Sequence, residues 1–229
     1  MFNKIKLNFY IYNSKYICTK KMELNYVKNI YEEIANHFEQ TRKGYYWNSI
    51  KNFISSIPAN SFILDCGCGN GKHMLLRNDC YFTGFDFCNN SMKICKNKNL
   101  EILINDVKLI PIRNNLFEYT LCVAVLHHLE SKSNRIQAIN ELSRVTKLNG
   151  YIYIQVWSSD VKKNKKFIKI NDNNDYFITW FVNKNKTIKR YYHLFEKEEL
   201  INLCKECNLD ICEIIYEFDN WIIIAKKTN

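Results

Sequence analysis

The sequence predicts an α/β protein in which helices cover both faces of a doubly wound, mostly parallel sheet. Two observations support this prediction. Short apolar runs alternate with helical patterns between Phe62 and Trp157, which is typical of parallel strands joined by crossover helices. Several of these runs end in an acidic residue, and the first continues into a glycine-rich turn. Because the carboxyl ends of parallel strands meet at one edge, these polar groups would gather there.

The chain ahead of the first strand predicts two helices. Apolar residues recur at helical spacing in the first of them: Val27, Ile30, Tyr31, Ile34 and Phe38. The second spans Trp47 to Ile57 and stops at Pro58. Residues 1–21 are basic and aromatic. We interpret them as a dispensable extension, with Met22 as an alternative start, rather than as a targeting presequence, because they contain no arginine. A single domain over residues 22–229 is therefore expected.

The first strand, Phe62–Leu64, leads into the turn Asp65–Gly71, in which every second residue from Gly67 is glycine. Glycine allows a tight turn and lets backbone amides approach a ligand without a Cβ between them. A dinucleotide-binding turn would carry its third glycine at position 72, where this chain has Lys72. We expect a helix to begin at Lys72, so that its free N–H groups face an anion. A chance glycine-rich turn is the alternative reading.

Three further strands are predicted after this turn: Tyr81–Asp86, Leu100–Ile104 and Tyr119–Val125. The carboxylate of Asp86 is placed to accept hydrogen bonds from two ribose hydroxyls. Asp106 follows the next strand, and the pair His127-His128 follows the last, at the mouth of the expected pocket. One such acid would more often be a solvated cap. Acids at the ends of successive strands indicate a site.

The second half of the chain predicts a helix, a fifth strand, an insertion and a terminal hairpin. The helix Asn134–Thr146 is followed by an αL cap at Asn149, and Tyr151–Trp157 is the strand. Residues 158–189 form a Lys- and Asn-rich insertion with little periodicity, and insertions of this length are functional or disordered. The remaining elements are a helix at Glu196–Cys207 and hairpin strands at Leu209–Tyr216 and Trp221–Ala225.

Charge and cysteine content narrow the class of protein. The net charge of +10 suits a polyanionic partner, although lysine is enriched together with asparagine and isoleucine, so charge alone does not decide. Most of the ten cysteines lie within predicted strands and helices, as small buried hydrophobes do. Cys204 and Cys207 form a lone C-x-x-C, so no metal site is expected. Reduced thiols predict the cytoplasm, with the nucleus as the alternative. No apolar run is long enough to predict a membrane span.

The acid-x-Gly-x-Gly-x-Gly turn resembles motif I of the S-adenosylmethionine (SAM) methyltransferases. The resemblance implies their Rossmann-like fold, a mostly parallel seven-stranded sheet with a C-terminal antiparallel hairpin, and SAM as the cofactor. An acidic strand end beside amide groups suits the ammonium and carboxylate of the methionine part of SAM. Asp106 would contact the adenine amino group. The residues expected to bind the cofactor are Asp65, Cys66, Gly67, Gly69, Asn70, Gly71, Asp86, Phe87, Asp106, Val107 and Ala124.

Further stretches resemble the tRNA wobble-uridine methyltransferases that esterify 5-carboxymethyluridine, including the domain fused to an AlkB-type hydroxylase. The distinctive ones are Thr41-Arg42, Ala124–Leu129, Arg190–Phe195 and Asp219–Trp221. The resemblance covers about residues 26 to 227. It implies tRNA as the substrate and a small zinc-containing activator protein that completes a sheet edge. The Lys- and Asn-rich insertion departs from the family pattern, which puts substrate detail in doubt more than the fold.

The proposed chemistry needs an anion clamp rather than a base. A carboxylate nucleophile is already ionised near neutral pH, and an arginine fork orients it without taking its lone pair. Arg42 and Arg190 are the first candidates, with the methionine carboxylate of SAM or a surface position as alternatives for Arg42. His127 and His128 follow the fourth strand. One would donate a hydrogen bond to the substrate carboxylate, and the other would bind substrate or cap the next helix.

The aromatic run before the last helix is a candidate for base recognition. Tyr191, Tyr192 and His193 would stack on the flipped wobble base or its neighbours, and burial against the sheet is the alternative for at least one of them. Four lysines of the insertion would contact phosphates or form a solvated loop: Lys162, Lys163, Lys165 and Lys166.

Two other functions compete with this reading. One is a SAM methyltransferase of a small molecule, which would not need a basic insertion. The other is a non-catalytic scaffold subunit with the same fold, which would be expected to lose the acids of the pocket. Asp65, Asp86 and Asp106 are all present, so an active enzyme is favoured.

Overall fold

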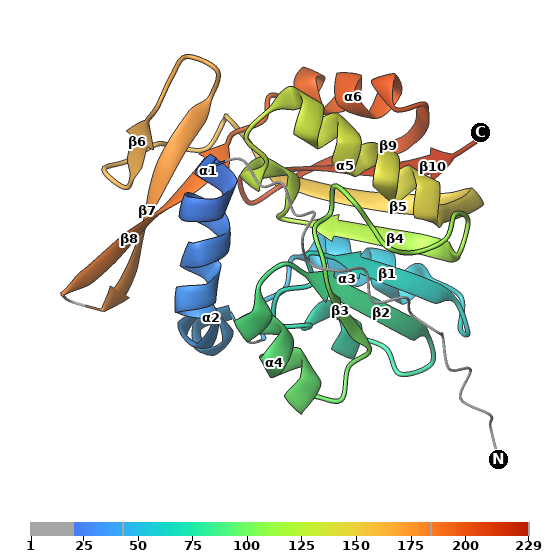
Figure 1. Ribbon diagram of the computed structural model, residues 1–229. Helices are drawn as coiled ribbons and strands as arrows, with labels where there is room; N and C mark the ends of the chain where they lie inside the picture. Colours follow the sequence, from blue (N-terminus) through green and yellow to red (C-terminus); the bar gives the residue numbers. More distant parts are fainter. Residues whose placement is uncertain (1–20, 43, 184, 229) are drawn as a thin grey trace.

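The computed structural model describes residues 21–42, 44–183 and 185–228, which form a large sheet flanked by helices and a smaller sheet beside it (Figure 1). The predicted extension at residues 1–21 therefore lies outside the described residues, except for Lys21. Among the described residues, no helix has the length and apolar character that crossing a membrane would need.

The large sheet has seven strands in the order β3-β2-β1-β4-β5-β10-β9. Strand β1 pairs in parallel with both β2 and β4, so the order of the strands reverses there, which is where ligands bind in such sheets. The last two strands are antiparallel, as the predicted terminal hairpin requires. The predicted fold class is thus confirmed. The strands are β1 Phe62–Cys66, β2 Tyr81–Asp86, β3 Ile102–Ile104, β4 Phe117–Val123, β5 Thr146–Trp157, β9 Leu209–Glu217 and β10 Asn220–Lys227.

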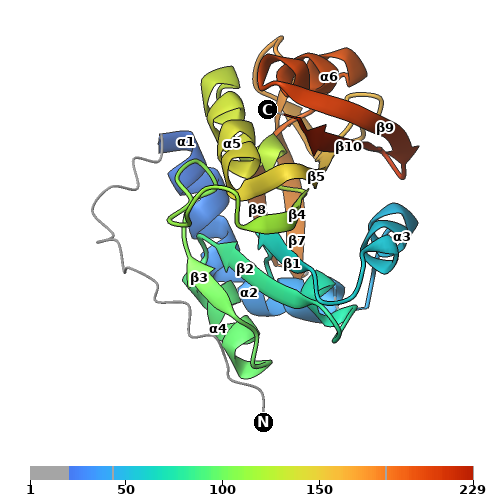
Figure 2. The same ribbon diagram turned by 90° about the vertical axis from the view of Figure 1, so that its right-hand side faces the viewer.

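Helices cover both faces of this sheet because its strands are apolar on both sides. Ile63 and Leu121 pack against one helix, whereas their neighbours Leu64 and Cys122 pack on the opposite face. Figure 2 shows α3 on one side of the sheet and α4 and α5 on the other. Helix α6 packs beside α5. The bounds are α3 Asn48–Ser56, α4 Asn89–Asn97, α5 Lys132–Val145 and α6 Lys197–Glu206.

The N-terminal helical segment lies between the two sheets (Figure 1). It consists of α1 Lys21–Glu23, a π-helical turn η2 Leu24–Lys28 and α2 Asn29–Arg42. The Glu32 carboxylate accepts hydrogen bonds from the backbone N–H groups of Asn89 (2.6 Å) and Asn90 (2.9 Å). These are free amides of the first turn of α4, so Glu32 fixes α2 to the large sheet.

The insertion predicted to lack periodicity forms an ordered antiparallel sheet. Its strands are β6 Phe167–Lys169, β7 Asp175–Asn183 and β8 Lys186–His193. A small core holds it: Val161, Tyr176, Ile178, Tyr192 and Leu194. Exposed lysines and asparagines surround these core positions, which weakens the sequence pattern of the strands.

The helix predicted to begin at Lys72 is absent, and this prediction is wrong. Only a 3-10 turn, η3 His73–Leu75, stands between the glycine turn and β2. The crossover from β1 to β2 spans residues 67–80, but the glycine turn takes up residues 67–71, so only the nine residues 72–80 remain before β2. The amides that face the cavity therefore belong to the glycine turn itself.

Nine described residues other than glycine have a positive φ, and three of them, in two turns, bear on the predicted elements. Asn149 has φ 63°, as predicted, but it lies within β5, after α5 has already ended at Val145. Asn149 is therefore not the cap of that helix. The hairpin between β9 and β10 turns through Phe218 (φ 44°) and Asp219 (φ 60°).

Candidate active site

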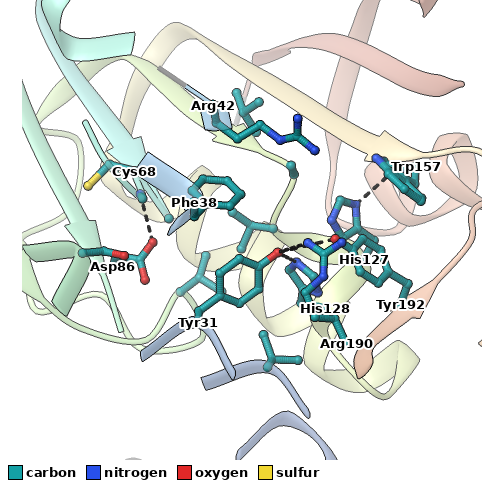
Figure 3. A pocket seen from close by; sticks show the side chains of 18 of the residues that line it. Tyr31, Phe38, Arg42, Cys68, Asp86, His127, His128, Trp157, Arg190 and Tyr192 are labelled. Carbon is teal, nitrogen blue, oxygen red and sulfur yellow. Dashed lines mark hydrogen bonds between the residues drawn. The ribbon is translucent and has the colours of Figure 1, made fainter. Parts of the chain in front are cut away.

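A cavity of about 470 Å3 lies at the carboxyl ends of the central strands. Its wall is completed by α2, the small sheet and the β9–β10 turn. Figure 3 shows its two ends: Asp86 and Cys68 lie on one side, and Arg190 lies with His127 and His128 on the other. The cavity thus has an end formed by the glycine turn and an end formed by charged and aromatic side chains.

At the first end, Asp86 is held by backbone amides. Its carboxylate accepts hydrogen bonds from the N–H groups of Gly69 (3.0 Å) and Cys88 (2.9 Å). Burial raises the pKa of Asp86 to about 6, although these amides act in the opposite direction. A carboxylate anchored in this way keeps lone pairs for a diol, which fits the expected ribose contact.

The glycines of the turn have different roles. Gly69 has φ +54°, and a Cβ there would meet nothing within 4 Å, so the turn leaves open space beside the cavity. Gly67 has φ +73°, and its Cβ would lie 2.3 Å from Cγ2 of Val125. A Cβ at Gly71 would lie as close to a neighbour, 2.3 Å from Cδ1 of Leu100. Gly67 and Gly69 line the cavity, whereas Gly71 does not, so its predicted cofactor contact is corrected to a packing role.

Two more predicted cofactor residues lie behind the cavity wall. Cys66 is fully buried in β1 and does not line the cavity, which corrects its predicted contact. Asp65 also lies behind the wall, and neither carboxylate oxygen has a hydrogen-bond partner among the described residues. The ring nitrogen Nδ1 of His73 lies 3.7 Å from one of these oxygens. A buried carboxylate without donors is costly, so Asp65 makes this end favourable for a positive charge.

The remaining predicted cofactor residues also line the cavity: Asn70, Phe87, Asp106, Val107 and Ala124. Ala124 has φ 61°, an unusual conformation for alanine. Asp106 accepts a hydrogen bond from the Lys108 backbone N–H (2.9 Å), and Lys108 Nζ lies 3.3 Å from its other oxygen. Lys108 Nζ also pairs with the buried Glu23. No local sequence pattern indicates this Glu23–Lys108 pair.

Arg190 is the central group of the second end. Its guanidinium is buried, and within the described residues it forms no ion pair. One nitrogen donates to Tyr31 Oη (3.1 Å), while Nε has no partner. The guanidinium carbon lies 4.5 Å from the Trp180 ring and 5.1 Å from the Tyr192 ring. A buried cation surrounded by aromatic rings and without a counter-ion favours an anionic ligand.

The two histidines are neutral, and their hydrogen bonds fix their tautomers. His128 Nδ1 lies 2.9 Å from the Tyr191 carbonyl, which only accepts, so Nδ1 donates. Its Nε2 therefore accepts from Tyr31 Oη (3.1 Å). Burial lowers the pKa of His128 to about 3, and the charge of Arg190 acts in the same direction. The resulting chain from Arg190 through Tyr31 to His128 locks the guanidinium in place.

His127 presents a free N–H to the cavity end. Its Nδ1 accepts from the backbone N–H of Trp157 (3.2 Å), so Nε2 carries the proton. Burial lowers the pKa of His127 well below its usual range, and the nearby His128 and Arg190 act in the same direction. Its ring stacks on Tyr192 with 4.7 Å between centroids. His127 and Arg190 are thus two fixed donors near one another (Figure 3).

The wall of the cavity carries two more cations. The guanidinium carbon of Arg42 lies 4.9 Å from the centroid of the Trp180 ring, which Arg190 also contacts. Lys72 also lines the cavity, although it was expected only as the start of a helix. Its Nζ lies 5.1 Å from the Trp47 ring, and burial lowers its pKa to about 8, with the charge of Arg42 acting in the same direction.

The structure separates the predicted aromatic trio. Tyr192 lines the cavity, whereas Tyr191 and His193 do not. Successive side chains of a strand point to opposite faces, so β8 turns Arg190 and Tyr192 inward and their neighbours away. Tyr191 Oη donates to Asp175 (2.8 Å), and His193 Nδ1 lies 2.8 Å from the same carboxylate. The predicted substrate contacts of Tyr191 and His193 are corrected to this buried network.

Comparisons with known proteins agree with the fold. A methyltransferase domain family matches residues 64–154. A tRNA (carboxymethyluridine(34)-5-O)-methyltransferase of Schizosaccharomyces pombe is 31% identical over 224 residues, which cover 90% of this chain and 97% of that protein. An Arabidopsis thaliana protein of the same name is 40% identical over 142 residues, which cover 62% of this chain and 35% of that protein.

Solved structures show the same fold at low identity. A SAM-dependent methyltransferase from Methanosarcina mazei has a TM-score of 0.68 and 18% identity, covering 80% of this chain and 98% of that one. A chain from the complex between the Haloferax volcanii Trm112 methyltransferase activator and a putative methyltransferase has a TM-score of 0.68 and 12% identity, covering 89% of this chain and 98% of that one. These structures show the fold. The Schizosaccharomyces pombe relative, matched along nearly its whole length, shows that the chain belongs to the tRNA (carboxymethyluridine(34)-5-O)-methyltransferase family.

Proposed function

We propose that this chain is a SAM-dependent enzyme that esterifies the carboxylate of 5-carboxymethyluridine at the wobble position of tRNA. The names of its relatives support the reaction. The observation that carries the proposal is Arg190, a buried guanidinium with no carboxylate partner among the described residues, which faces the end of the cavity opposite Asp86.

SAM supplies an activated methyl group on a sulfonium, and residues of this chain suit its binding. Asp86 would accept hydrogen bonds from the ribose, and Asp106 would face the adenine. Asp65 lies behind the turn, where its unpaired negative charge favours the ammonium group. Arg42 and Lys72 are the cations that would face the methionine carboxylate. The open space beside Gly69 leaves room for the cofactor.

The substrate end has the features that a carboxylate nucleophile needs. Carboxyl groups ionise near pH 4, so no general base is required, and neutral histidines suit that requirement. The fork of Arg190 would orient one carboxylate oxygen, and His127 Nε2–H would donate to the other. Tyr31 and His128 would hold Arg190 in place. Holding two reactants in a fixed, dry geometry supplies much of the rate enhancement of such a transfer.

An activator protein is the second part of the proposal. Strand β3 is only three residues long and, among the residues that the structure describes, pairs with β2 alone, so one of its edges is free of any described strand. Ile104 at its end and Leu109 nearby are 55% and 56% exposed. Free strand edges with apolar neighbours invite pairing with another chain. We propose that a small zinc-containing activator of the Trm112 type covers this edge.

The reaction is tested by incubating the purified chain and its activator with SAM and tRNA that carries 5-carboxymethyluridine. Mass spectrometry of the nucleosides should show the methyl ester. Omission of the activator should lower the yield. The proposal fails if the complete mixture forms no ester on the RNA, or if the methyl group is transferred only to a small molecule.

A further inference from the structure

The rim of the cavity contains an aromatic residue that the catalytic proposal does not use. Phe218 lines the cavity and is 68% exposed. It lies in the β9–β10 turn with φ 44°, where asparagine or glycine is the favoured residue. A bulky side chain in this backbone conformation is strained. Because the ring is exposed, burial of apolar surface does not offset that strain. The fold alone therefore does not explain this residue.

The turn that carries Phe218 is well held. Asn220 Nδ2 donates to the Phe218 carbonyl (2.6 Å), and the Ser158 backbone N–H donates to the Asp219 carbonyl (2.9 Å). The second bond joins the turn to the start of the segment that leads into the small sheet. Phe218 is thus presented on a fixed support next to that segment.

The small sheet adds a second aromatic ring beside a cation. Phe181 in β7 is 50% exposed, and Lys166 Nζ lies 5.5 Å from its ring centroid. Lys166 itself lines the cavity, so this pair also stands at the rim. Three more exposed lysines precede it, and within the described residues none of the four forms an ion pair: Lys162, Lys163, Lys165 and Lys166.

We propose that this rim, defined as Phe218, Phe181 and the four lysines, binds the nucleotides on either side of the target uridine in a single-stranded RNA loop. The inference rests on the proposed function, because it takes the substrate to be one nucleotide within an RNA. A base that enters the cavity leaves its stack, so its neighbours lose a stacking partner. Exposed phenylalanine rings replace that partner for any base, and lysines pair with the phosphates. Separate exposed rings, one of them in contact with a lysine, suit RNA better than an apolar protein surface.

The decisive variant is Phe218→Asn in the full-length chain. Asparagine accepts the left-handed conformation, so the thermal unfolding midpoint should stay equal or rise. Binding of a fluorescein-labelled anticodon stem-loop RNA, followed by anisotropy, should weaken about tenfold, since a base stacked on an aromatic ring contributes about 1–3 kcal/mol. SAM affinity, measured by calorimetry, should not change. Tyr81→Ala is the matched control, because Tyr81 is 56% exposed at the start of β2, the end of that strand away from Asp86.

The charge of the rim is tested with a triple variant, Lys162→Gln, Lys163→Gln and Lys165→Gln. The slope of the logarithm of the affinity against the logarithm of the salt concentration should fall by about 2, since each phosphate contact contributes about 0.7 on a single strand. A control triple variant at exposed lysines elsewhere should keep the parental slope: Lys51, Lys96 and Lys205.

Binding and methyl transfer are measured separately, so the two proposals can fail separately. Parental RNA binding without ester formation would refute the proposed reaction and leave the rim in place. Ester formation together with parental RNA affinity in Phe218→Asn would refute the rim alone. A parent that does not bind the stem-loop RNA at all would also overturn the rim.

Discussion

The two ends of the cavity are built by different means. At the cofactor end, backbone amides of a turn hold Asp86, and the glycines set the shape. At the substrate end, side chains from α2, the segment after β4 and β8 meet around Arg190. The first end depends on local sequence, because strand, turn and acid are contiguous. The second depends on tertiary structure, because Tyr31, His128 and Arg190 are far apart along the chain.

This difference predicts which variants separate cofactor binding from turnover. Changes at the glycine turn should act on SAM affinity, with or without a loss of stability. Changes around Arg190 should act on methyl transfer while SAM affinity is retained.

Arg190→Gln should lower kcat/KM for ester formation by about 10²–10³-fold, the size of effect seen when a preorganised donor is lost. SAM affinity by calorimetry should remain at the parental value. Because Arg190 is a buried cation with no ion-pair partner among the described residues, the variant should also unfold at the same temperature or higher. Arg190→Lys, the matched control, should retain part of the activity. Loss of SAM binding in Arg190→Gln would contradict the division between the two ends.

Gly67→Ala and Gly69→Ala should distinguish a glycine that is needed for packing from one that leaves room for the ligand. At Gly67 the new Cβ would lie 2.3 Å from Val125, so this variant should unfold several degrees earlier. At Gly69 the new Cβ meets no protein atom within 4 Å, so the loss of stability should be smaller and come from the backbone strain at φ +54°. The Gly69 variant should nevertheless bind SAM at least about tenfold more weakly. Equal effects of both variants on stability and on affinity would contradict this assignment.

SAM affinity should depend on pH through Asp86. Burial raises the pKa of this carboxyl to about 6, and only its ionised form accepts hydrogen bonds from both ribose hydroxyls. Affinity should therefore be constant above the pKa and fall as the pH is lowered through 6. Titration calorimetry between pH 5 and 8 measures this. Asp86→Asn should bind weakly at every pH, and a pH profile that survives in this variant would assign the titration to another group.

His193 should give the smallest effect, on stability alone. Burial by itself would lower the pKa of His193, but hydrogen bonds to Asp175 and Glu199 outweigh burial and raise it. The protonated ring thus stabilises the folded state. This contribution is complete below the unfolded pKa, near 6.5, and is lost as the pH rises through the higher folded value. The difference in unfolding temperature between the parent and His193→Gln should therefore shrink above neutral pH. A constant difference would contradict this explanation.

The elements that follow from local patterns were predictable, and those that depend on long-range packing were not. The strand Tyr81–Asp86 has the predicted bounds, because an apolar run ending in an acid is a complete local signal. The helix expected at Lys72 is not formed, because the glycine turn takes up part of the crossover and leaves only a short stretch before β2. The small sheet escaped prediction because exposed lysines and asparagines obscure its alternation.

The site residues divide in the same way. Asp86 and Gly69 line the cavity, as the turn motif indicates, but no local pattern shows that Tyr31 contacts His128 and Arg190. The periodicity of α2 marked Tyr31 only as a residue of a buried helix face. Strand alternation in β8 would have separated Tyr192 from its two neighbours, had that segment been recognised as a strand.

The central claim is that Arg190 binds the carboxylate that receives the methyl group. The most direct measurement compares two stem-loop RNAs that differ only at the wobble position, one with 5-carboxymethyluridine and one with its neutral amide. The parental chain should prefer the carboxylate RNA by about tenfold, and Arg190→Gln should bind both equally. A preference for the carboxylate that persists undiminished in Arg190→Gln would contradict the account.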